Sequence, residues 1–209
     1  MLTLVNNLVK SLSLFHPVPK EVKNFFITHC RIRKVNRGDF LLTPGEVCDK
    51  YFFIHQGVIR AFIRENSREV TTWISINNEL VTSIYSMLEQ RPSIEYIQAI
   101  RDTTLLELNE IDVEQLYKVV PEFNIISRKL ITAYYQDAEV RSFIARMPSA
   151  ESRCQFFLKT YPEKAILVPK KYIASFLGIR EETLSRAMRK RKWVLFIYFD
   201  LSQSSLSFY

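Results

Sequence analysis

The sequence has few of the residues that mark disulfide-bonded or metal-binding domains. Its three cysteines, Cys30, Cys48 and Cys154, lie far apart and form no C-x-x-C pair. Neither a disulfide framework nor a zinc site is therefore indicated, and a reducing cytoplasm is the expected compartment. An iron–sulfur cluster held by protein thiolates needs four cysteine ligands, so these three cysteines argue against that cofactor as well.

Long apolar runs and catalytic motifs are also missing. No apolar run approaches the roughly eighteen residues of a membrane span, and the amphipathic N-terminus has no small-residue cleavage site, so we expect neither a span nor a signal peptide. No phosphate loop, Ser/His/Asp set or carboxylate pair stands out, so we expect no enzyme and no catalytic residues. A haem on His16, His29 or His55 stays open, although a lone histidine in an apolar segment is more often a packed, hydrogen-bonded residue.

Glycine is scarce, and its positions are informative. The chain has only four glycines, and Gly38, Gly45 and Gly57 fall among short apolar segments of β character. Glycines at this spacing relieve the turns and bulges of strands that fold back on themselves, which predicts a small β-roll. Further strands are expected over residues 69–76, 94–100 and 104–108.

The charge of the chain is uneven. The formal net charge is +7, but residues 141–192 hold thirteen Lys and Arg against four Asp and Glu, a net +9, and the remainder carries −2. With 47% hydrophobic residues there is ample material for packed cores. A basic C-terminal third on a nearly neutral body predicts a polyanionic partner for that third alone.

Residues 170–191 have the spacing of a helix-turn-helix. Ala174 is small where two helices would meet, and Gly178 can take the left-handed conformation of a tight turn. The second helix carries groups able to read base edges, followed by cations for phosphates. The alternative is an ordinary helical hairpin with a solvated charged face. The candidate DNA-binding residues are Lys170, Lys171, Glu182, Ser185, Arg186, Arg189 and Lys190.

A long helix is predicted between the β segments and this basic region. Apolar residues recur there at alternating steps of three and four, which is a heptad frame with one polar member. The candidate dimer-interface residues are Phe123, Ile126, Leu130, Ala133, Asp137, Val140 and Ile144. A helix that packs only on its own β-roll is the alternative. Ile125, Ile131, Tyr134 and Phe143 give the helix a second apolar face, so one face can pack on the roll while the other pairs with a second chain.

Two segments carry a family resemblance. Residues 170–189 resemble the DNA-reading unit of the catabolite-activator/FNR family, and Glu182-Thr-Leu-Ser185-Arg186 is similar to the Glu-x-x-Ser-Arg pattern of its FNR branch. The segment with three glycines resembles the start of the family's cyclic-nucleotide-binding β-roll. The resemblance implies a homodimer that binds a two-fold operator in double-stranded DNA and alters transcription initiation with RNA polymerase, with no role for a membrane.

The effector region departs from the family pattern. Members that bind cyclic AMP have a Gly-Glu pair and an Arg-Ser pair here, whereas this chain has Asn78-Glu79, and the arginine position falls near Ser93. Losing a phosphate-pairing arginine removes a contact of about 1.5–3 kcal/mol. The sequence therefore argues against cyclic AMP and favours a neutral or cationic effector, or none, with no bound cofactor. The candidate pocket residues are Glu79, Ser83, Tyr85, Arg91, Ser93 and Tyr134.

We therefore expect an α+β chain with three parts. Residues 1–120 form a cyclic-nucleotide-binding-like β-roll (jelly roll) with flanking helices, 121–147 a dimerisation helix, and 148–209 a winged helix-turn-helix. The tail after Lys192 has no turn glycine, so it is either a single strand with a disordered end or a buried segment, and a wing stays open. The alternative function is a ligand-binding sensor or scaffold that has lost specific DNA reading.

Overall fold

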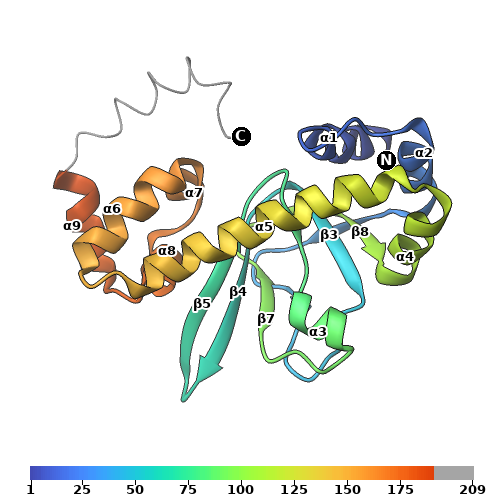
Figure 1. The fold of residues 1–209 in the computed structure, drawn as a ribbon. Helices are drawn as coiled ribbons and strands as arrows, with labels where there is room; N and C mark the ends of the chain where they lie inside the picture. Colours follow the sequence, from blue (N-terminus) through green and yellow to red (C-terminus); the bar gives the residue numbers. More distant parts are fainter. Residues whose placement is uncertain (191–209) are drawn as a thin grey trace. The chain divides into compact units, whose positions relative to one another are not determined.

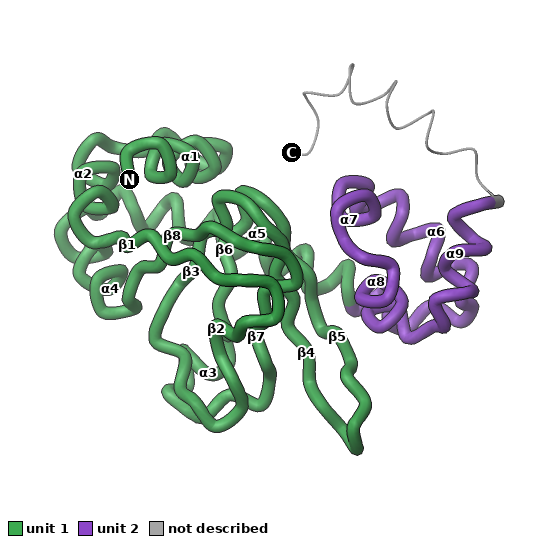
Figure 2. Tube along the Cα trace, turned by 180° about the vertical axis from the view of Figure 1, so that it is seen from behind, with its two compact units in different colours: residues 1–141 green, residues 142–209 purple. Residues whose placement is uncertain are grey.

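A computed structural model describes residues 1–190 and divides the chain into two compact units (Figures 1 and 2). The first unit spans Met1–Arg141, and the second begins at Ser142. Helix α5 (Glu122–Arg146) runs from one into the other. The boundary therefore falls inside a helix and not in a loop.

The first unit contains two four-stranded antiparallel sheets. One sheet has the order β1-β8-β3-β6 and the other the order β2-β7-β4-β5. Because neighbours in each sheet are mostly distant in sequence, the strands wind into a roll and not a simple meander. The strands are β1 (Arg31–Val35), β2 (Phe40–Leu42), β3 (Lys50–Gln56), β4 (Ile59–Glu65), β5 (Arg68–Ser75), β6 (Leu80–Val81), β7 (Tyr96–Ala99) and β8 (Thr103–Asn109).

Side-chain alternation along the strands builds two separate cores. Phe52 and Ile54 of β3 point into the roll, where they join Ile59 and Ala61 of β4 and Leu105 of β8. The alternate residues of β3 and β8 point the other way, into a second core. That core includes Phe53 of β3, with Leu106 and Leu108 of β8.

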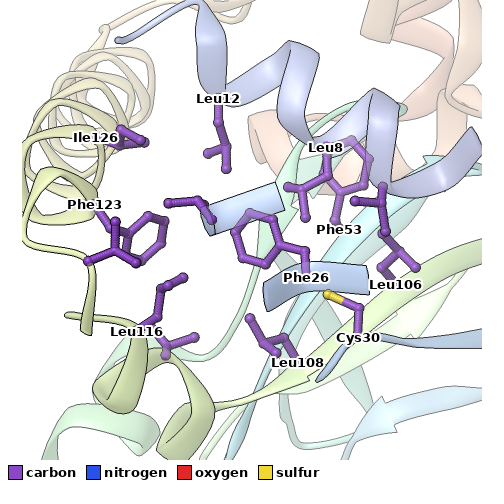
Figure 3. Packing of buried hydrophobic residues seen from close by; sticks show 14 residues of the cluster. Leu8, Leu12, Phe26, Cys30, Phe53, Leu106, Leu108, Leu116, Phe123 and Ile126 are labelled. Carbon is purple, nitrogen blue, oxygen red and sulfur yellow. The ribbon is translucent and has the colours of Figure 1, made fainter. Parts of the chain in front are cut away.

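Helices cover this second face of the β1-β8-β3-β6 sheet (Figure 3). They are α1 (Leu2–Ser13), α2 (Lys20–His29), α4 (Glu110–Val119) and the start of α5. Leu8 and Leu12 of α1, Phe26 of α2, Leu116 of α4 and Ile126 of α5 are buried together there. A sheet buried on both faces needs continuous apolar strands, which explains why β3 reads Tyr-Phe-Phe-Ile.

The second sheet holds a buried charge. Arg60 of β4 is only 3% exposed, and its guanidinium donates to Gln98 Oε1 at 2.9 Å and to Glu69 Oε2 at 2.5 Å. It also lies 4.0 Å above the ring of Phe62. Arg64 binds the other oxygen of Glu69 at 3.0 Å. A buried guanidinium is tolerated only when paired and hydrogen-bonded, and these contacts meet that requirement.

The second unit consists of short helices around a small apolar core. They are α6 (Ala150–Thr160), α7 (Pro162–Leu167), α8 (Lys170–Leu177) and α9 (Glu181–Lys190). Ser149 caps α6 by accepting a hydrogen bond from Ser152 N at 3.0 Å, as its position before the helix predicts. Pro162 follows the end of α6 and is also the first residue of α7. At that position the N–H that proline lacks would have no partner within the helix.

The fold class expected from the sequence is confirmed. The roll, the flanking helices, the long helix and the helical C-terminal unit all occur in the expected order. The expected strand at 94–100 is shorter, and the 78–92 segment contains β6 and the short helix α3 (Ile84–Glu89). The possible wing falls in residues 193–209, outside the described residues. No helix in residues 1–190 is long and apolar enough to cross a membrane.

Gly57 provides a test of how tightly the roll is packed. Its φ is +133°, and an added Cβ would lie 2.2 Å from Thr103 Oγ1 and 2.8 Å from Thr103 Cα. We expect Gly57→Ala to lower the free energy of unfolding by about 3 kcal/mol or more, because backbone strain and overpacking both contribute. Chemical denaturation measures this loss.

Gly45→Ala is the matched control. Gly45 also has a positive φ, +95°, but nothing lies within 4 Å of its added Cβ. This variant should lose only the strain, about 1–2 kcal/mol. Equal losses for the two variants would contradict close packing of β8 against Gly57.

Candidate nucleic-acid interface and effector region

Helices α8 and α9 form the helix-turn-helix that the sequence predicts. Gly178 ends α8 in the left-handed conformation, with φ 62° and ψ 39°. The turn closes with a hydrogen bond from Ile179 N to Ala174 O at 3.0 Å. Ala174 and Leu184 are buried between the helices. The small residue, the glycine and the apolar frame therefore have the roles that their spacing indicates.

An open groove of about 680 Å³ lies along the start of α9. Acidic and basic side chains both line the groove, because α9 presents them on the same side. Carboxylates in the first turn of α9 are favoured by the helix dipole, so Glu182 is stable there. The residues that line the groove are Arg180, Glu182, Thr183, Arg186 and Arg189.

The structure brings together part of the predicted DNA-binding set. Glu182, Arg186 and Arg189 line the groove, and Ser185 lies beside it, its carbonyl accepting from Arg189 Nε at 3.4 Å. Lys170 and Lys171 are exposed at the start of α8. The side chain of Lys190 is outside the described part of the chain.

Sequence reasoning missed Arg180 and Thr183. Arg180 lies in the turn after Gly178, and its carbonyl accepts from Thr183 N at 3.0 Å at the start of α9. Their position in the motif could have identified them. A turn residue just before the second helix lines the same groove as the first residues of that helix.

In the effector region, the predicted residues Ser83 and Ser93 both hydrogen-bond to Glu95, which was not predicted. Ser83 and Ser93 are 2% and 3% exposed. Ser83 Oγ donates to Glu95 Oε1 at 2.7 Å, and Ser93 Oγ donates to Glu95 O at 2.9 Å. Glu95 has the same parity as the inward-facing Ile97 and Ala99, so strand alternation was the signal that could have identified it.

The environment of Glu95 shifts its titration. Burial raises the pKa of the Glu95 carboxyl above its ordinary value, against the opposing effects of hydrogen bonds from Ser83 and Trp73 and of attraction by Arg141. The region that we predicted as an effector site thus contains a half-buried acid. An anionic ligand would be repelled by this carboxylate.

The other predicted effector residues have other partners or are exposed. Tyr134 of α5 accepts a hydrogen bond from Leu80 N at 2.7 Å, and its pKa is raised by burial and by the nearby charge of Glu79. Tyr85 is exposed on α3. Arg91 is also exposed, and its Nε lies 4.0 Å from Glu89 Oε2. The arginine closest in sequence to the expected phosphate position is therefore solvent-exposed and lies near an acid.

The heptad residues of α5 fall on the side that packs within the chain. Phe123 and Ile126 belong to the core between α5, α2 and α4 (Figure 3), and Leu130 packs against that core. Ile144 is buried, and Ala133, Asp137 and Val140 are half-buried, Asp137 being hydrogen-bonded to Arg141. Packing on the chain's own roll, the alternative open at the sequence level, accounts for Phe123 and Ile126.

Two of the three histidines, His29 and His55, have ordinary structural partners. His55 Nδ1 lies 3.0 Å from Asn7 Nδ2, and His29 Nδ1 lies 2.9 Å from Phe25 O. In residues 1–190, no group of three or more His, Cys, Asp or Glu is placed to hold a metal ion.

The chain is similar to known proteins in sequence pattern and in fold. The family model of the cyclic nucleotide-binding domain matches residues 32–119, which contain the roll and α4. FixK2 from Bradyrhizobium japonicum has 16% identity and a TM-score of 0.66, with 77% of this chain and 83% of that chain covered. The chain has the fold of the catabolite-activator/FNR regulators. No curated protein sequence matches it.

Two further structures with this catabolite-activator/FNR fold have similar coverage. A CooA mutant from Carboxydothermus hydrogenoformans has 17% identity and a TM-score of 0.64, with 80% of this chain and 78% of that chain covered. CLP from Xanthomonas campestris, described as a c-di-GMP responsive global regulator, has 14% identity and a TM-score of 0.63, with 80% and 88% covered. The likeness therefore extends over both units and not only over the cyclic nucleotide-binding domain.

The geometry predicts that the region matched by the cyclic nucleotide-binding model does not bind cyclic AMP or cyclic GMP. Ser93 is buried without charge, Glu95 is acidic and Arg91 faces solvent. A cyclic phosphate that loses its water needs an opposing charge, which these residues do not supply. Calorimetry with millimolar nucleotide should show no binding heat, and a micromolar dissociation constant for either nucleotide would contradict this reading.

Proposed function

We propose that the protein is a sequence-specific DNA-binding transcription regulator that acts as a homodimer. The observation that carries this proposal is the groove along α9, where Glu182 and Arg186 stand together on the second helix of a helix-turn-helix. An arginine can make a bidentate contact to guanine O6 and N7, and a glutamate can accept from cytosine N4. One G·C-containing half-site can therefore be read by these two side chains.

The charge distribution supports the same function. Residues 141–192 carry a net +9, and Lys170 and Lys171 are exposed cations at the start of α8. Cations around a reading helix bind phosphates and fix its position on the duplex without selecting sequence. The family fold also supports a partner in RNA polymerase and a cytoplasmic place of action, with a regulatory and not an enzymatic role.

A second copy of the chain is the partner that we propose for the outer face of α5. Ile131 and Tyr135 are 62% and 66% exposed there, and Ala138 is exposed one turn further on. Their spacing of four and three continues to Ser142, which is a heptad frame offset from the one we expected. Small residues at Ala138 and Ser142 would let two helices approach closely.

Arg186→Ala tests the reading role. We expect it to weaken binding to the specific operator by about 1–3 kcal/mol and to relax preference at one G·C pair, because the bidentate contact carries base identity. Lys170→Ala is the matched control, since loss of a phosphate contact should weaken operator and random DNA alike. Mobility-shift assays on operator and competitor fragments measure both changes.

The same assay separates the two candidate functions. Discrete genomic fragments retained by the wild-type protein over excess competitor support a regulator. Uniform weak retention, together with equal effects of Arg186→Ala on operator and random DNA, would favour a sensor or scaffold that has lost specific DNA reading.

A double substitution on α5 tests the dimer. Ile131→Glu with Tyr135→Glu places two charges in the proposed seam without entering the core, so sedimentation should show monomers at concentrations where the wild-type protein is dimeric. The control is Ile84→Glu with Tyr85→Glu on α3, where both side chains are 57% exposed. An unchanged dimer for the α5 variant would place the interface elsewhere.

A further inference from the structure

Arg180 occupies the N-cap position of α9, where its side chain cannot help to begin the helix. Its carbonyl oxygen accepts from Thr183 N at 3.0 Å and from Leu184 N at 3.2 Å, which marks it as the residue just before the first turn. Serine, threonine, asparagine and aspartate are favoured there because their side chains accept from N–H groups of that turn. A guanidinium has donors only. Arg180 therefore cannot supply the cap that Ser149 gives to α6.

The charge of Arg180 is also unfavourable at this position. The N-terminus of a helix is the positive end of its dipole, which repels a cation and favours acids such as Glu181 and Glu182 in the first turn. Arg180 is exposed, and no acceptor in residues 1–190 forms a hydrogen bond or an ion pair with its guanidinium. Neither capping nor charge within α9 therefore explains an arginine at this position.

The groove along α9 does offer an explanation. Arg180 lines it together with Glu182 and Arg186, the pair proposed to read bases. The first residues of a reading helix are those that reach base edges, whereas cations elsewhere bind phosphates and position the protein. Lys170 and Lys171 on α8 are already available for phosphates. The fork of an arginine in the groove matches O6 and N7 of guanine.

The two arginines of the groove are too far apart along α9 to serve the same base pair. At about 1.5 Å of rise per residue, Arg180 and Arg186 leave the backbone roughly 9 Å apart along the helix axis. Successive base pairs of B-DNA are separated by about 3.4 Å. Each arginine is therefore expected to meet a base pair of its own.

We propose that Arg180 is a second specificity-determining arginine, which sets a preference for guanine at a base pair different from the one that Arg186 reads. The inference rests on the proposed function and adds to it the content of the half-site, which then holds at least two G·C pairs. Local folding rules are most often broken at functional sites, and an arginine at the N-cap of α9 is such a break.

Arg180→Ser separates reading from folding, because the two properties should change in opposite directions. A serine at the N-cap accepts from the first turn, so the amides from residue 183 to residue 187 of the full-length protein should exchange their hydrogens about threefold or more slowly than in the wild-type protein. Faster exchange would make Arg180 a residue that stabilises the helix, and the inference would then be wrong.

Selection of full-length protein on a library of randomised double-stranded DNA measures the reading. Arg180→Ser should lose about tenfold of the preference for G·C at one position and keep the preference at the position that Arg186→Ala relaxes. Arg186→Ala should show the converse. Lys171→Ser is the matched control, because it removes the same charge from an exposed site on α8 and should weaken all sequences alike.

The outcomes distinguish this inference from the function on which it rests. Base preferences that Arg180→Ser leaves unchanged, or equal weakening of all sequences by that variant, would overturn the inference, the second by making Arg180 a phosphate contact. A loss confined to the position that Arg186→Ala relaxes would overturn it as well. In each of these cases the wild-type protein still selects a sequence, so the proposed function stands. A wild-type protein that selects no sequence would refute both.

Discussion

Burial of both faces of the β1-β8-β3-β6 sheet is the constraint on which the first unit depends. Phe52 turns into the roll and Phe53 turns outward on the same strand, so the outward face cannot stay in water. Helices α1, α2 and α4 and the start of α5 cover it. The direction in which α5 leaves the roll is therefore fixed by apolar burial at residues 123–126, and the rest of the helix follows from there.

The roll uses buried charge in two different ways. Arg60 is paired with Glu69 and Gln98, and the hydrogen bonds and charges of Arg60 and Arg64 hold the pKa of Glu69 below its ordinary value despite partial burial. Glu95 accepts side-chain hydrogen bonds from Ser83 and Trp73, and its pKa moves the other way because burial outweighs these stabilising contacts. The first arrangement satisfies a buried guanidinium, whereas the second keeps an acid where burial opposes its ionisation.

Local patterns in the sequence were enough for the fold class and for the helix-turn-helix. Gly178, Ala174 and the glycines of the roll act over a few residues, so their spacing reports their geometry directly. The effector region and the dimer face were harder. Ser83 and Glu95 come from different elements, and their contact depends on how the roll closes. On α5, two heptad frames coexist, and only the packing of Phe123 and Ile126 shows which of them faces the chain's own core. The tail beyond residue 190 lies outside the described residues.

The uneven attachment of α5 has a consequence for its response to salt. Apolar contacts such as those of Phe123 and Ile126 do not weaken as ionic strength rises, whereas the attraction between partly exposed charges such as Asp137 and Arg141 is screened over about 8 Å in physiological solution. Dissolved ions therefore act on one end of this helix and leave the other end unaffected. The contacts at one end of this connecting helix therefore depend on the ionic composition of the solution, without any ligand specific to the roll.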